Sequence, residues 1–127
     1  MKIVNISKWY SLIIGTLIIV LWIMILFVEQ LPEGKTELIF HIASEFFMAI
    51  LCIIGAYLLQ KKNMKGIYFC LTGFSMIFYS TINAIGYYIH LKNLVMIILL
   101  LSVFFLTSLF LILCWKYVHR LFKHNNF

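Results

Sequence analysis

The sequence contains very few charged residues. Aspartate and glutamate together number 4 in 127 residues, and all charged residues make up 11% of the chain. A soluble domain carries about a quarter charged residues. Hydrophobic residues make up 65% of the chain, and the mean hydropathy is +1.07. This composition excludes an ordinary soluble domain and predicts an integral membrane protein.

Cysteine and proline are also scarce. The three cysteines, Cys52, Cys70 and Cys114, form no C-x-x-C pair. An odd number of thiols without that spacing argues against a disulfide framework and a zinc site. We therefore expect the three cysteines to pack as small apolar residues. The only proline, Pro32, lies in a polar segment with Gly34, a combination that ends helices.

Four continuous apolar runs occupy most of the chain, approximately residues 9–28, 38–59, 67–89 and 94–117. A helix of about 20 residues spans the ~30 Å hydrocarbon core of a bilayer. Strands of a transmembrane barrel would instead alternate apolar and polar residues. The breaks are short, which makes neighbouring helices antiparallel. The sequence therefore predicts an all-α integral membrane fold, a single four-transmembrane-helix antiparallel bundle (up-down-up-down) over residues 1–127.

Basic residues are concentrated on one side of this predicted bundle. Eight flank that side, and only Lys35 and Lys92 flank the other. The eight are Lys2, Lys8, Lys61, Lys62, Lys65, Lys116, Arg120 and Lys123. The positive-inside rule then places both termini in the cytoplasm and the chain in the inner (cytoplasmic) membrane. The net charge of +6 therefore indicates the lipid bilayer as a partner, and nucleic acid is not expected.

The second run carries a ladder of ionisable residues on one helix face. Glu37, His41 and Glu45 are spaced four apart, and Met48 continues the stripe. The opposite face is large and apolar, so the stripe is expected to face the other helices. A charged carboxylate inside a span costs roughly 2.5–3.5 kcal/mol, so Glu45 must be protonated, paired or hydrated. The structural alternative is a helix–helix hydrogen bond from Glu45 to Asn83 or to a tyrosine hydroxyl.

The third run presents a second polar stripe at the same expected depth. Five side chains share one face or its edge at helical spacings: Tyr79, Ser80, Asn83, Tyr87 and His90. At helical rise, Glu45 and Asn83 each lie about 12 Å below the outer boundary. Trp22 and Ser102, on the first and fourth runs, reach a similar depth and are expected to line the walls. The two stripes predict an outward-facing polar pocket between the second and third helices.

The leading functional hypothesis is that this pocket binds or passes a small cation, proton or polar ligand. Glu45 would carry the charge, and His41 would exchange protons with it. In the alternative interpretation, His41 only pairs with a neighbouring glutamate. Glu37 lies at the mouth, and Asn83, Tyr87 and His90 would orient the ligand. A bundle this small would need a homo-oligomer to transport a solute.

Two other functions stay open. The first is an accessory or assembly subunit whose polar stripe docks a partner transmembrane helix. The second is a metal or haem site at His41, Glu45 and His90. The spacing of four between Glu and His differs from the Glu-x-x-His of di-iron bundles, so no cofactor is expected. The sequence holds no recognisable set of catalytic residues, and an enzyme is not expected.

Overall fold

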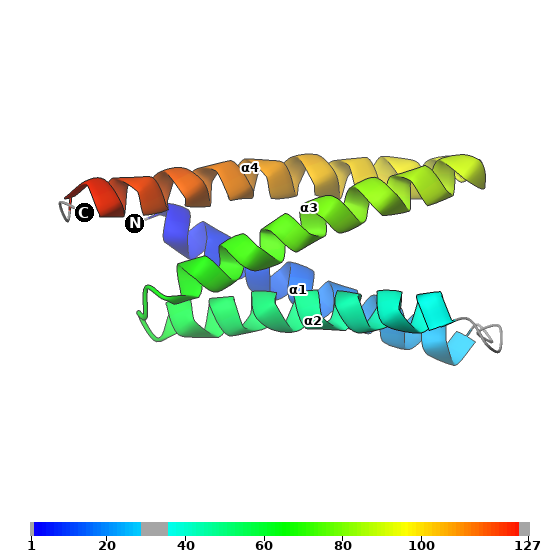
Figure 1. Ribbon diagram of the computed structural model, residues 1–127, viewed down its shortest axis with the longest axis horizontal. Helices are drawn as coiled ribbons and strands as arrows, with labels where there is room; N and C mark the ends of the chain where they lie inside the picture. The colour runs from blue at the N-terminus through cyan, green and yellow to red at the C-terminus, as the bar shows by residue number, and fades with distance from the viewer. Residues whose placement is uncertain (1, 29–35, 125–127) are drawn as a thin grey trace.

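The described part of the chain is entirely helical. The computed structural model describes residues 2–28 and 36–124, and within these ranges it contains four helices and no strand (Figure 1). The helices are α1 (Lys2–Val28), α2 (Thr36–Gln60), α3 (Gly66–His90) and α4 (Leu94–His124). The predicted all-helical class is confirmed.

All four helices are long and apolar enough to cross a membrane. Many large apolar side chains on their outer faces are exposed, among them Leu17, Ile50 and Leu99. Such a surface is unfavourable in water and well matched to lipid tails. The structure is therefore consistent with a membrane protein.

Two helices extend beyond the apolar runs that predicted them. α1 begins at Lys2 rather than near residue 9, and α4 continues to His124 rather than to about residue 117. The apolar runs mark the hydrocarbon core, whereas backbone hydrogen bonding continues into polar helix ends. Both ends of α2 and α3 lie within two residues of the predicted bounds.

Short turns join α2 to α3 and α3 to α4. Each contains one lysine with positive φ, Lys62 at 58° and Lys92 at 56°. The asparagine that follows, Asn63 or Asn93, donates its backbone N–H to a carbonyl of the preceding helix. This left-handed cap satisfies carbonyls at the helix end and redirects the chain within a few residues. α3 consequently packs against both α2 and α4.

The helices form two pairs that diverge at one end. α1 packs along α2, α3 packs along α4, and α1 and α3 cross between α2 and α4 (Figure 1). We call the end with both chain termini and the α2–α3 turn the termini end, and the end with the α3–α4 turn the opposite end. Toward the opposite end the α1–α2 pair separates from the α3–α4 pair.

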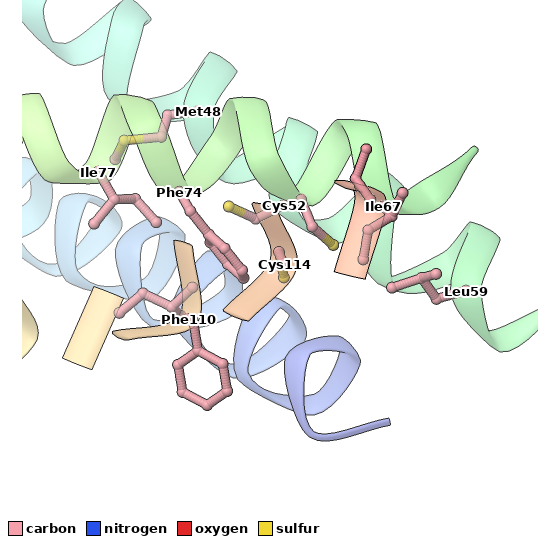
Figure 2. Packing of buried hydrophobic residues seen from close by; sticks show 11 residues of the cluster. Met48, Cys52, Leu59, Ile67, Phe74, Ile77, Phe110 and Cys114 are labelled. Carbon is pink, nitrogen blue, oxygen red and sulfur yellow. The ribbon is translucent and has the colours of Figure 1, made fainter. Parts of the chain in front are cut away.

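The core lies where the two pairs meet. Side chains from all four helices are buried there, and Figure 2 shows Cys52, Phe74 and Cys114 pointing toward one another at its centre. These three side chains are 0% exposed. Met48 and Ile77, toward the opposite end of this cluster, are 3% and 2% exposed. The core therefore closes the space between the helix pairs below the predicted pocket.

Candidate functional site

Glu45 and Ser80 join α2 to α3 on the opposite-end side of the core. The Ser80 hydroxyl donates a hydrogen bond to Glu45 Oε1, and both residues are half-buried. One helical turn further toward the core, Met48 and Ile77 are buried. The two predicted stripes therefore meet through this hydrogen bond, directly above the core.

On the α2 side, His41 packs against α1. Its ring and that of Trp22 are 5.8 Å apart between centroids and meet edge to face at 74°. His41 is otherwise exposed, and in the described ranges no hydrogen bond or ion pair connects it to Glu45. The side chain of Glu37 lies outside the described residues. The structure thus places His41 at the outer end of the α1–α2 pair, one turn from Glu45.

On the α3 side, the stripe is exposed beyond Ser80. Asn83 and His90 are exposed, and Tyr87 is 60% exposed with its ring edge to face with Tyr88 at 5.2 Å. Within the part of the chain that the structure describes, none of these three side chains hydrogen-bonds to α2. By helical spacing they continue along α3 from the Ser80 side toward the opposite end.

The peripheral candidates also remain apart from Glu45. Tyr79 is 70% exposed. Ser102 is exposed on α4 and donates to the carbonyl of Ile98 in its own helix at 3.0 Å. By contrast, Ser80 bonds to Glu45, Trp22 packs against His41, and Met48 is buried in the core.

The described residues contain no group of three or more His, Cys, Asp or Glu side chains placed to hold a metal ion. The set of His41, Glu45 and His90 is accordingly dispersed over α2 and α3.

A second polar cluster, which the sequence did not predict, lies in the core. The Ser11 hydroxyl donates to the Cys52 carbonyl at 2.6 Å, and the Cys70 thiol donates to Ser11 Oγ at 3.5 Å. The Cys114 thiol donates to Ser7 Oγ at 3.3 Å. We call these five residues the serine–cysteine cluster. They connect α1 to the other three helices.

Tyr10 adds a hydrogen bond and a ring contact between α1 and α4. The Tyr10 and Thr107 hydroxyls are hydrogen-bonded at 2.5 Å, and the Tyr10 ring stacks on Phe110 at 4.3 Å. Every buried side-chain nitrogen or oxygen in the described residues has a hydrogen-bond partner. The core contains polar groups, and all of those described are hydrogen-bonded within the protein. The core therefore closes the space below the predicted pocket.

The sequence carries one signal for this cluster. Ser7, Ser11 and Gly15 are spaced four apart, which puts three small residues on one face of α1. Such a stripe permits close helix packing, and a Cβ added at Gly15 would lie 3.0 Å from the Ala49 carbonyl oxygen. Small-residue spacings of this kind are common in membrane helices, so the stripe alone does not single out this cluster.

Comparison with known families assigns the chain to one of them. A family model described as a domain of unknown function, DUF8058, matches residues 1–126, so the chain belongs to this family. No curated protein matches the sequence. No solved structure matches the fold.

Proposed function

We propose that this member of the DUF8058 family is a multi-pass inner-membrane protein that binds a small cation, proton or polar ligand in a polar vestibule open to the outside. The vestibule is the space at the opposite end bordered by His41, Glu45, Ser80, Asn83 and Tyr87. Glu45 is its charged group. The Glu45–Ser80 hydrogen bond, above a closed core and below exposed polar side chains, is the observation that carries the proposal.

The proposed orientation places the vestibule outside the cell. All four acids of the sequence lie in residues 29–45, and eight of the ten basic residues flank the termini end. The positive-inside rule assigns the basic end to the cytoplasm. The helices then run up, down, up and down across the membrane, with both termini in the cytoplasm.

The energetics of burial support water in the vestibule. Asn83 and Glu45 lie about 10–14 Å from the helix ends at helical rise, within the thickness of the bilayer. Polar groups at that depth are unfavourable against lipid tails, and such residues normally face a bundle interior or a water-filled cavity. Because Asn83 and His41 are exposed in the single chain, water or a partner must cover them.

The closed core favours binding over conduction. A solute that passed Glu45 would meet Met48, Ile77 and Phe74, which are 3%, 2% and 0% exposed. These side chains leave no polar path through the centre of one chain. We therefore assign the vestibule to ligand binding or proton exchange with the outside, and passage through the bundle would require the helix pairs to separate.

The second candidate is docking of a partner transmembrane helix between the diverging pairs. The observation in its favour is the exposure of Tyr79 and Tyr87, at 70% and 60%, beside the same space. Tyrosine combines a large ring with a hydroxyl and is suited to such contacts. A docked helix would cover the polar stripe and exclude water.

Thiol labelling from outside the cell tests the vestibule. The native cysteines are 0% exposed, so a membrane-impermeant maleimide is expected to give low labelling of the unsubstituted protein. Asn83→Cys is expected to react because water reaches it. The matched control is Ile82→Cys. Ile82 is 49% exposed on the adjacent apolar face, so a cysteine at this position is expected to face lipid and stay unreactive.

Two outcomes contradict the proposal. If Asn83→Cys folds and inserts but stays unlabelled, the space is dry, and a docked helix becomes the better function. If Asn83→Cys and Ile82→Cys react equally, the outer end of α3 is in open solvent and the vestibule is not a defined site.

A further inference from the structure

A hollow on α4 lies at the termini end, away from the vestibule. It has a volume of about 300 Å³ and is lined by Trp115, Lys116, His119 and Arg120. All four side chains are exposed, Trp115 to 68%. Trp115 and His119 are four residues apart, as are Lys116 and Arg120, so the two pairs form adjoining rows on one side of α4. We call this surface the α4 hollow.

Lys116 and Arg120 have no ion-pair partner within residues 2–28 and 36–124. No acid occurs after Glu45 in the sequence. Among the described residues, no hydrogen bond or ion pair engages the Lys116 or Arg120 side chain. Two lysines at this end do have partners: Lys8 donates to Gln60 Oε1 at 2.7 Å, and Lys61 lies 5.7 Å from the Tyr57 ring. The hollow therefore presents unneutralised positive charge.

The length of α4 places the hollow at headgroup depth. α4 has 31 residues, and about 20 of them cross the hydrocarbon core. Leu94 to Trp115 spans about 30 Å at helical rise, so Trp115 and Lys116 lie at the boundary between the hydrocarbon core and the headgroups of the other leaflet, and Arg120 lies beyond it. In the proposed orientation this is the cytoplasmic leaflet, which contains the anionic lipids.

An apolar strip continues from the hollow toward the middle of the membrane. Phe105, Leu109 and Ile112 are 66%, 52% and 54% exposed. With Lys116 they occupy positions separated by four, three and four residues, so they lie on one face of α4. A molecule with a charged head in the hollow can lay an aliphatic chain along this strip.

We infer that the α4 hollow binds the phosphate headgroup of an anionic phospholipid of the cytoplasmic leaflet. Arg120 provides a planar fork of donors suited to phosphate oxygens, and Lys116 provides a point charge. Trp115 occupies the interface, and one acyl chain packs against Ile112 and Leu109. The inference rests on the proposed membrane insertion and orientation, and it is independent of the vestibule.

Fluorescence quenching by brominated lipids tests the site. Trp115 becomes the only tryptophan when Trp9 and Trp22 are replaced by phenylalanine. We expect brominated phosphatidylglycerol to quench Trp115 at a lower mole fraction in vesicles than brominated phosphatidylcholine. Combining Lys116→Gln with Arg120→Gln should weaken that preference on the order of 10-fold or more, because each cation near the surface contributes ~1 kcal/mol.

The control removes the same charge elsewhere at the same end. Lys61→Gln with Lys65→Gln leaves the hollow intact and should retain the preference. Equal loss in this control would show diffuse surface charge and would overturn the site, as would equal quenching by the two lipids. Displacement of the brominated phosphatidylglycerol by millimolar inorganic phosphate would assign the hollow to free phosphate and overturn the lipid assignment.

Native mass spectrometry of the unsubstituted protein gives a readout that does not depend on the tryptophan replacements. Phosphatidylglycerol is expected to stay bound to this protein and to be lost from the Lys116→Gln, Arg120→Gln protein. Retention of the lipid by the substituted protein to the same extent would contradict the inference.

Discussion

One carboxylate, Glu45, determines which ligands the proposed vestibule can hold. Its Oε1 atom accepts the Ser80 hydroxyl, and the second oxygen is available to a ligand. A carboxylate attracts a cation and repels an anion. The neighbouring polar groups, His41 and Asn83, can complete the coordination of a small cation through water.

Glu45→Gln separates the charge of this residue from its structural role. The glutamine carbonyl can still accept the Ser80 hydrogen bond, so the thermal stability of the free protein should change little. Stabilisation by a bound cation should disappear, whereas the unsubstituted protein should gain about 2.7 kcal/mol at a ligand concentration of 100 times Kd. Thermal unfolding in detergent with sodium, potassium, magnesium and calcium chlorides measures both quantities.

Ser80→Ala is the control because it removes the hydrogen bond and keeps the charge. This variant should retain cation-induced stabilisation. A cation that stabilises the Glu45→Gln protein as much as the unsubstituted protein would remove Glu45 from the site.

At the scale of the helices, the contact between α2 and α3 depends on glycine. A Cβ added at Gly66 would lie 2.7 Å from the Gly55 carbonyl oxygen, and one added at Gly73 would lie 2.6 Å from Cys52 Sγ. The two helices therefore approach to backbone distance on the core side of Glu45. This close contact fixes the floor of the vestibule while the outer parts of the helices diverge.

Alanine substitution should distinguish this contact from ordinary helix positions. Gly66→Ala is expected to destabilise the fold by about 1–3 kcal/mol because the obstructing atom belongs to the backbone of α2. Gly86→Ala, on the same helix with nothing within 4 Å, should be neutral or stabilising by up to about 1 kcal/mol. Thermal or denaturant unfolding in one detergent compares them. Equal effects would contradict a close α2–α3 contact.

The sequence predicted the helices better than their contacts. Continuous apolar runs indicate membrane-spanning helices, and helical spacing placed Glu45 and Ser80 on two stripes, although Glu45 bonds to Ser80 and not to the expected Asn83 or tyrosine hydroxyl. The serine–cysteine cluster was not predicted, because its hydrogen bonds join residues 41 to 107 positions apart. Periodicity reports which face a residue occupies, but it does not report which distant small residue lies opposite. The divergence of the helix pairs is likewise a property of tertiary packing.

At the scale of the whole molecule, charge is strongly segregated. No acid lies outside residues 29–45, while Lys61, Lys62 and Lys65 occupy the α2–α3 turn and its flanks. Positive residues in short loops resist translocation across the membrane. The segregation therefore favours one orientation of the bundle in the membrane.

Reporter fusions test that orientation. Green fluorescent protein fused after residue 127 should fluoresce, and alkaline phosphatase at the same position should be inactive, because this end is proposed to be cytoplasmic. The same phosphatase fused in the α3–α4 turn after Lys92 should be active. An active phosphatase at the C-terminal position would reverse the proposed orientation and place the vestibule in the cytoplasm.

The hydrogen bonds of α1 also set an order of assembly during synthesis. Cys114 and Thr107 bond to residues of α1 that precede them by 107 and 97 positions. At a synthesis rate of ~5–20 residues per second, about 5–20 s pass between the appearance of α1 and that of its α4 partners. Ser7 and Tyr10 lack these bonds throughout that interval. The helix that is made first is therefore the last to have its core contacts completed, and α4 closes the bundle.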